Sequence, residues 1–162
     1  MIKELIQNAD DAIVIKVKLL YDERNNSNSQ VKLLDSAMKG LQGPALSVYN
    51  DATFKDHDFE NLVKLNAATK RQRTDKISQF GFGFNAVYNM TDVPVLISRN
   101  YLIYLDPHTT YLDKAILDKP RIKLNLKASG RWLSNFSDEF EPFNGIFRCR
   151  LTGNSTVIWL IR

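Results

Sequence analysis

Three polar residues near the start of the chain, Glu4, Asn8 and Asp11, are spaced so that they would share one face of a helix. Positions i, i+4 and i+7 fall on the same side of an α-helix. On such a face an amide oxygen can bind Mg²⁺ while a carboxylate orients a water for attack on a phosphate. The same residues are common on the solvated face of an arbitrary helix, so the spacing alone does not identify a site.

Two further motifs have the chemistry of a ligand site. Gly81 and Gly83 enclose one phenylalanine before an apolar run, so backbone amides can approach an anion there and a helix dipole would favour it. An isolated Gly-x-Gly is also an ordinary turn, and neither a P-loop lysine nor a third glycine follows. Asn50 and Asp51 end another apolar run. A side-chain oxygen of either residue could accept from the exocyclic amine of adenine, or form an Asx turn.

The pattern of apolar residues predicts the elements that must position these side chains. Apolar residues three and four apart indicate helices, and strict alternation indicates strands. The predicted helices cover residues 2–12, residues 53–68 with Thr53 as the N-cap, and residues 81–90. The predicted strands cover residues 13–20, 45–49, 95–98, 101–105, 145–151 and 156–161, with irregular chain between 106 and 144. Helices come early and strands late, which favours an α+β sandwich.

The composition narrows the class of protein. A chain of 162 residues with 44% apolar residues is long enough for one globular domain with a substantial core. The net charge of +4 is spread along the chain, so nucleic acid is not implied. No apolar run approaches the roughly 18 residues of a membrane span, and the lone Cys149 agrees with a reducing compartment. We therefore expect a cytoplasmic protein without a membrane partner.

In their order along the chain, the motifs resemble a known nucleotide site. The series is Glu-x-x-x-Asn-x-x-Asp, a strand ending in Asn-Asp, and Gln-Phe-Gly-x-Gly-Phe opening a helix. It resembles the GHKL ATPase fold shared by gyrase, histidine kinases and the ninety-kilodalton heat-shock chaperone. More specifically, the chain resembles the sacsin-like repeat domain. The segments that carry this resemblance are residues 3–12, 42–46, 49–52 and 80–88, extended by 91–94 and 105–108.

The resemblance implies a fold and two ligands. The fold would be a two-layer α/β sandwich of the GHKL, or Bergerat, type over residues 1–162, with a mostly antiparallel mixed sheet and helices on one face. The ligands would be ATP and Mg²⁺, with Glu4 as the general base, Asn8 as the metal ligand and Asp11 supporting their helix face. Because the helix that carries these residues begins with essentially no preceding chain, we expect the domain to be truncated at its N-terminus.

The resemblance also implies which other residues contact the nucleotide. Asn50 or Asp51 would face adenine, and Thr156 would approach the base from the last strand. Gly81 and Gly83 would give the phosphates room, and Phe84 would begin the helix behind them. The basic segment 69–78 falls where the family has its mobile lid.

Departures from the family pattern leave two functions open. Where the chaperone has Asp-x-Gly-x-Gly, this chain has Ala52 and Phe54 in place of glycines, so the adenine contact is expected to be weaker or shifted by one residue. Residues 67–69 are Ala-Ala-Thr where the lid entry of the family has glycine and serine, so any hydrolysis is expected to be slow. The first function is an ATP-binding, slowly hydrolysing module of a sacsin-like chaperone or co-chaperone, working with other domains of a larger chain, with chaperones or with client proteins. The second is a degenerate fold that serves as a non-hydrolysing protein-interaction scaffold. A nucleic-acid binder is disfavoured because residues 70–76 lack interleaved aromatics.

Overall fold

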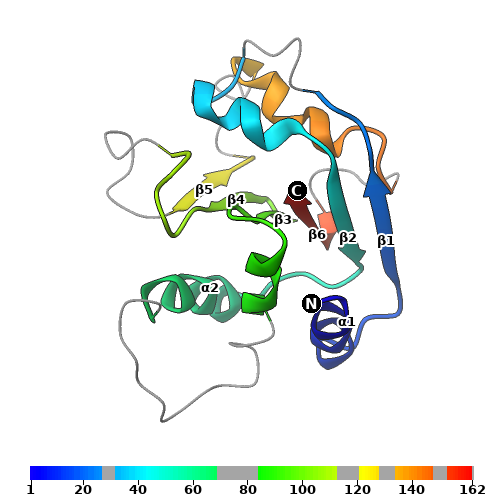
Figure 1. Cartoon of the computed structure of the whole chain (residues 1–162). Helices are drawn as coiled ribbons and strands as arrows, with labels where there is room; N and C mark the ends of the chain where they lie inside the picture. Colours follow the sequence, from blue (N-terminus) through cyan, green and yellow to red (C-terminus); the bar gives the residue numbers. More distant parts are fainter. Residues whose placement is uncertain (27–31, 69–83, 113–120, 128–133, 148–152, 162) are drawn as a thin grey trace.

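A computed structural model describes residues 1–26, 32–68, 84–112, 121–127, 134–147 and 153–161. Its centre is an open six-stranded sheet with the strand order β1-β2-β6-β3-β4-β5 (Figure 1). The strands are β1 (Val17–Asp22), β2 (Ala45–Asn50), β3 (Val95–Arg99), β4 (Tyr101–Leu105), β5 (Arg121–Asn125) and β6 (Gly153–Ile161). Each neighbouring pair is antiparallel, so the expected α+β class and the mostly antiparallel pairing are confirmed, whereas the expected mixed character is wrong for the described strands.

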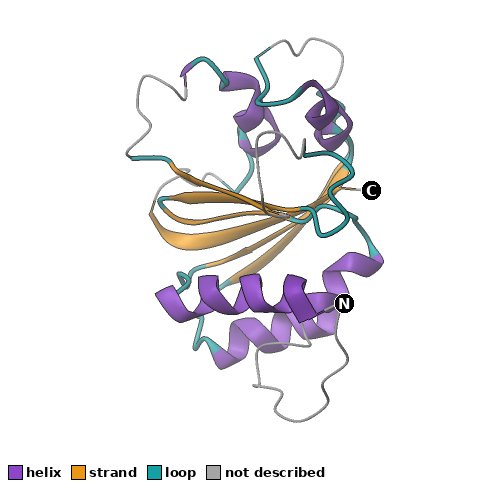
Figure 2. Cartoon of the chain, turned by 90° about the vertical axis from the view of Figure 1, so that its left-hand side faces the viewer, coloured by secondary structure: helices purple, strands orange, loops and turns teal. Residues whose placement is uncertain are grey.

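Helices cover both faces of the sheet, as Figure 2 shows. The face that carries α1 (Ile2–Asp11) and α2 (Asp56–Ala68) is called the α face. The short 3-10 helices η1 (Ser36–Gln42) and η3 (Ser137–Phe143) cover the opposite face, called the 3-10 face. The prediction of helices on one face is therefore wrong. The central strands bury apolar residues on both sides, and both sides need a cover.

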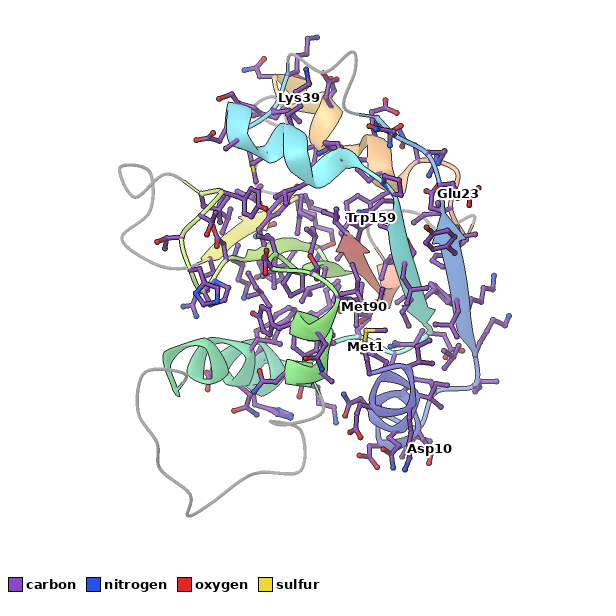
Figure 3. The ribbon with its side chains drawn as sticks, in the orientation of Figure 1. Met1, Asp10, Glu23, Lys39, Met90 and Trp159 are labelled. Atoms are coloured by element: carbon purple, nitrogen blue, oxygen red, sulfur yellow. The ribbon has the colours of Figure 1, made fainter. Side chains whose placement is uncertain are left out.

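Each face has its own apolar cluster. On the α face, Leu5 of α1 and Phe59 of α2 pack on Leu96 and Ile158 of the sheet. On the 3-10 face, the cluster contains Met38, Leu102, Tyr104, Phe143 and Trp159, among others. Figure 3 labels Trp159, whose side chain belongs to this second cluster. The central strand β6 supplies both clusters, because its residues alternate between the faces.

Most predicted elements are present with shifted ends. The helix at the start and the strands near 45–49, 95–98, 101–105 and 156–161 are confirmed as α1, β2, β3, β4 and β6. The first strand begins at Val17 rather than at 13. Thr53 is not the N-cap of α2, which begins at Asp56. There the Lys55 N–H donates to the Asp58 carboxylate at 2.7 Å, which caps the helix start instead.

Other predictions need correction. Helical structure follows Phe84, with the 3-10 helix η2 at Ala86–Asn89, but the start of the predicted helix at 81–83 lies outside the described residues. Residues 145–147 form a turn instead of a strand, and 148–152 are not described. The stretch expected to be irregular contains β5 and η3. Within the described part of the chain, no helix is long and apolar enough to cross a membrane.

Candidate functional site

A pocket opens on the α face between the two α-helices and the sheet. Its apolar wall comes from both helices, from the helical segment after residue 83 and from the sheet: Leu5, Val48, Leu62, Phe84 and Ile158. Its polar residues come from segments far apart in the sequence: Asn8, Asn50, Thr53, Asp58, Asn61 and Thr156. An apolar wall with a few polar groups suits a flat, mostly apolar ligand that has hydrogen-bonding groups along its edge.

The first helix presents only part of its predicted polar stripe to this pocket. Leu5, Asn8 and Ala12 line it, and buried Leu5 anchors that side of α1 against the sheet. Glu4 is half-buried and Asp11 is exposed, and neither lines the pocket. The helix therefore brings the predicted metal ligand to the pocket but places the predicted base beside it.

The turn after β2 distinguishes Asn50 from Asp51. Asn50 lines the pocket, and its Oδ1 accepts a hydrogen bond from the Ala52 N–H at 3.1 Å, which makes an Asx turn. Asp51 does not line the pocket, because its Oδ1 accepts from the N–H groups of Ile15 and Lys16, each at 3.0 Å. The Lys16 N–H bond is the main cause that lowers the pKa of Asp51. Asn50 is thus positioned to contact a ligand, whereas Asp51 ties the turn to the chain before β1.

A chain of hydrogen bonds holds the segment after this turn against the sheet. Thr156 donates its hydroxyl proton to the Ala52 carbonyl at 2.9 Å. Its oxygen lies 2.8 Å from that of Ser98, so Ser98 must donate to Thr156. The Phe54 N–H in turn donates to the Ser98 oxygen at 2.9 Å. Both hydroxyls are buried and fully directed, so Thr156 positions the turn rather than offering a free donor.

Sequence reasoning missed three polar residues of this region. Asp58 and Asn61 lie one turn apart on α2 and line the pocket, together with Leu62. Their spacing was the available signal: residues 58 and 61 are three apart, so on a helix they lie on the same side, next to the apolar residue at 62. Ser98 could have been found as the buried-strand hydroxyl that directly follows the apolar run 95–97 of β3.

The remaining predicted residues divide in two. Phe84 is buried and lines the pocket wall. Gly81, Gly83 and the basic segment 69–78 lie outside the described residues. Among the residues that the structure describes, no three His, Cys, Asp or Glu side chains are grouped closely enough to hold a metal ion.

Comparison with known proteins gives the family. The model of the family described as "Sacsin domain" matches residues 1–161. The chain is also 42% identical over 151 residues to human sacsin, an alignment that covers 92% of this chain and 3% of that protein. The chain thus spans a small fraction of the length of this relative, as one domain among others would. With a family match over nearly all of its residues, this chain belongs to the Sacsin domain family.

Proposed function

We propose that the chain is a single GHKL-type domain that binds ATP and hydrolyses it slowly, as a module of a sacsin-like chaperone or co-chaperone. The observation that carries this proposal is the meeting of Asn8, Asn50, Phe84 and Thr156 at one pocket. These residues come from four segments far apart in the sequence. The family resemblance places each of them at the nucleotide, and unrelated residues would be scattered over the fold.

Adenine fits the pocket by shape and by hydrogen bonding. The apolar wall can cover the faces of a purine, and the Asn50 amide carries both an acceptor and donors for its edge. The Asx-turn bond uses one lone pair of Oδ1 and leaves the second lone pair and the NH₂ group. Asn50 would therefore read the base, while Ser98 and Thr156 keep its turn in place.

Asn8 is the residue proposed to hold Mg²⁺. Magnesium in nucleotide sites takes one or two protein ligands and completes its octahedron with phosphate oxygens and water, so one amide oxygen fits this role. The bound ion would neutralise phosphate charge. Glu4, one helical turn before Asn8, would orient the attacking water. Because Glu4 lies beside the pocket rather than in its lining, turnover is expected to be slow.

A second function is favoured by the same positions. Glu4 does not line the pocket, and positions 52 and 54 carry alanine and phenylalanine in place of glycines. Both features suit a fold that no longer hydrolyses ATP. Such a domain would act as a scaffold for protein interactions in the cytoplasm. In either case its partners would be other domains of a longer chain, chaperones or client proteins.

Thermal unfolding with and without ATP and Mg²⁺ separates the two functions. A ligand of the native state stabilises it by about 2.7 kcal/mol at a hundredfold excess over Kd. Asn8→Ala should reduce the magnesium-dependent part of this shift, and Glu4→Ala should keep the shift while abolishing phosphate release. Asp10→Asn, on the exposed side of α1, is the matched control. No shift in the folded wild-type protein would reject ATP binding and leave the scaffold.

A further inference from the structure

The exposed apolar side chains of the described residues are concentrated near the start of the chain. Among the described residues, the large apolar side chains that remain exposed all lie between residues 2 and 21: Ile2, Ile6, Ile13, Ile15, Leu19 and Tyr21. Leu19 is 45% exposed and Tyr21 is 53% exposed, although both belong to a strand of the sheet. Such a concentration on an otherwise well-covered fold marks an interaction surface.

This surface includes a free edge of the sheet. Strand β1 stands last in the strand order, and among the described strands only β2 pairs with it (Figure 1). A strand at the edge of a sheet presents N–H and C=O groups that can pair with another chain. Natural proteins usually protect such edges with charged side chains, and Lys18 does so on one side of β1, but Leu19 and Tyr21 leave its other side apolar and exposed.

The register identifies which residues of β1 present these groups. The Asp51 N–H donates to the Lys16 carbonyl at 3.3 Å, and the register pairs Val17 with Asn50. Lys16 and Asp51 therefore form a hydrogen-bonded pair, and the pairing alternates along antiparallel strands. It follows that Val17, Leu19 and Tyr21 direct their backbone groups away from β2, toward the free edge.

The same alternation places apolar side chains beside the free backbone groups. On the α face, Leu19 stands opposite Val48 and Val48 stands opposite Ile158, so these residues form one row across the sheet. The row is buried at Val48 and Ile158 but exposed at Leu19. A strand added beyond β1 would continue this row and remove the side chain of Leu19 from water.

Charge on the opposite side of β1 indicates what kind of strand fits. Lys16 and Lys18 are exposed, and neither lies within ion-pair distance of a described carboxylate, although the charge of Lys16 contributes to lowering the pKa of Asp51. The Lys18 ammonium lies 5.4 Å from the centre of the Tyr49 ring, which holds it over the sheet. Of the nearby carboxylates, Asp22 is paired with Arg24, and Asp51 accepts backbone N–H groups. Cross-strand pairs of opposite charge stabilise a sheet, and like pairs destabilise it. Acidic residues on the added strand therefore suit this side.

We propose that the β1 edge binds an extended segment of a partner protein as an added strand, in which apolar residues alternate with glutamate or aspartate. The apolar residues would cover Leu19 and Tyr21, and the carboxylates would lie beside Lys16 and Lys18. Main-chain hydrogen bonds supply affinity in this mode of binding, and alternate side chains supply specificity. A second copy of the chain is a poorer occupant because it would bring its own lysines to the edge.

A short blocked peptide alternating valine and glutamate is the probe, compared with the same peptide carrying lysine for glutamate. Amide hydrogen exchange should slow at Val17, Leu19 and Tyr21 on binding, because these amides gain partners. The glutamate peptide should bind roughly tenfold more tightly at low salt. Equal binding of both peptides, or protection elsewhere on the sheet, would overturn the proposal.

Charge reversal sharpens the test. The double change Lys16→Glu with Lys18→Glu should reverse the preference toward the lysine peptide, whereas Lys39→Glu on η1 should leave it unchanged. Sedimentation of the protein without peptide checks the other occupant. Concentration-dependent dimers that protect the same three amides would show that a second copy takes this edge, and the partner-strand proposal would fail.

Discussion

The two faces of the sheet differ in what they bury, although the same strands build both. The α face has a pocket edged by amides, a carboxylate and a directed hydroxyl. The 3-10 face is closed by Trp159, Phe143 and their neighbours. Strand β6 contributes Thr156 to the first and Trp159 to the second. Ligand contacts and packing are therefore assigned to alternate residues of one strand, and a change at one position can affect one without the other.

The 3-10 face has one ionisable pair at its centre. Glu139 of η3 is almost fully buried, and its Oε2 accepts from the Tyr104 hydroxyl at 2.6 Å. Its other oxygen accepts from the Leu34 N–H at 2.7 Å. Burial raises the pKa of Glu139 above its ordinary range. This carboxyl fastens a loop and a 3-10 helix to β4, so its role is structural.

The largest effect is expected from emptying the 3-10 face. Trp159→Ala removes the largest fully buried side chain among the described residues and should lower the free energy of unfolding by about 3–5 kcal/mol. Urea denaturation measures this loss. Ser47→Ala is the matched control, since Ser47 stands opposite Trp159 and its buried hydroxyl has no hydrogen-bond partner in the part of the chain that the structure describes. A loss below about 1 kcal/mol for Trp159→Ala would contradict the assignment of that face to stability.

Breaking the buried pair should cost less. Tyr104→Phe leaves one oxygen of Glu139 without its donor, which should destabilise the fold by about 1–3 kcal/mol. The same change in a Glu139→Gln background should cost less, because no buried carboxylate is then left unpaired. Denaturation of the four proteins in a double-mutant cycle tests this. Additive losses would show that the two groups do not interact.

The corresponding change on the α face should separate binding from stability. Thr156→Val keeps the shape of the side chain but removes the proton given to Ala52 and the oxygen that accepts from Ser98. We expect a loss of stability of about 1–2 kcal/mol. We also expect ATP at a given concentration to raise the unfolding temperature of this variant less than that of the wild-type protein. Val157→Ala, on the other face of the same strand, should lower stability and leave the ligand shift intact. If Val157→Ala reduced the ligand shift and Thr156→Val did not, the assignment of ligand binding to the α face would be refuted.

The smallest effect concerns pH. Because the pKa of Glu139 is raised in the folded state, this group lowers stability as pH rises above its ordinary value of 4.5. Burial raises the pKa of Asp22, but the hydrogen bonds and charge of Arg24 outweigh it, so the net shift is downward. Asp22 therefore stabilises above its ordinary value of 3.8, and this contribution is lost as pH falls. In denaturation measured as a function of pH, Glu139→Gln should reduce the loss of stability as pH rises above 4.5. Asp22→Asn should reduce the loss of stability as pH falls below 3.8.

The sequence predicted elements with a strong pattern and missed those without one. Strand β4 was predicted at its observed bounds, because 101–105 is an uninterrupted apolar run of strand length. Strand β5 was missed although Arg121–Asn125 alternates between polar and apolar residues, because the strand is short and has only two apolar residues, Ile122 and Leu124. The 3-10 helices η1 and η3 were missed because they are too short for a helical period to be visible, whereas η2 lies within the helix predicted at 81–90.

The residues of the candidate site likewise include some that motifs predicted and others that only the three-dimensional structure decides. Asn8, Asn50, Phe84 and Thr156 were predicted from motifs, and they line one pocket. Asp51 shares the motif with Asn50 but bonds to the chain before β1, which only the three-dimensional path of the turn decides. Asn61 carries no motif, and its place in the pocket depends on how α2 is rotated about its axis.

The hydroxyl chain through Ser98 and Thr156 makes the pocket sensitive to changes that never touch a ligand. These two residues are register partners on β3 and β6, and together they bind the turn at Ala52 and Phe54. A one-residue slip of β6 would send Thr156 to the opposite face and release the turn. The geometry of the pocket therefore depends on the correct register of β6 in the sheet. A missense change at Ser98 would be expected to release the turn, as a slip of β6 would, and so to impair the domain. Every proposed ligand-contacting residue would remain intact in such a variant.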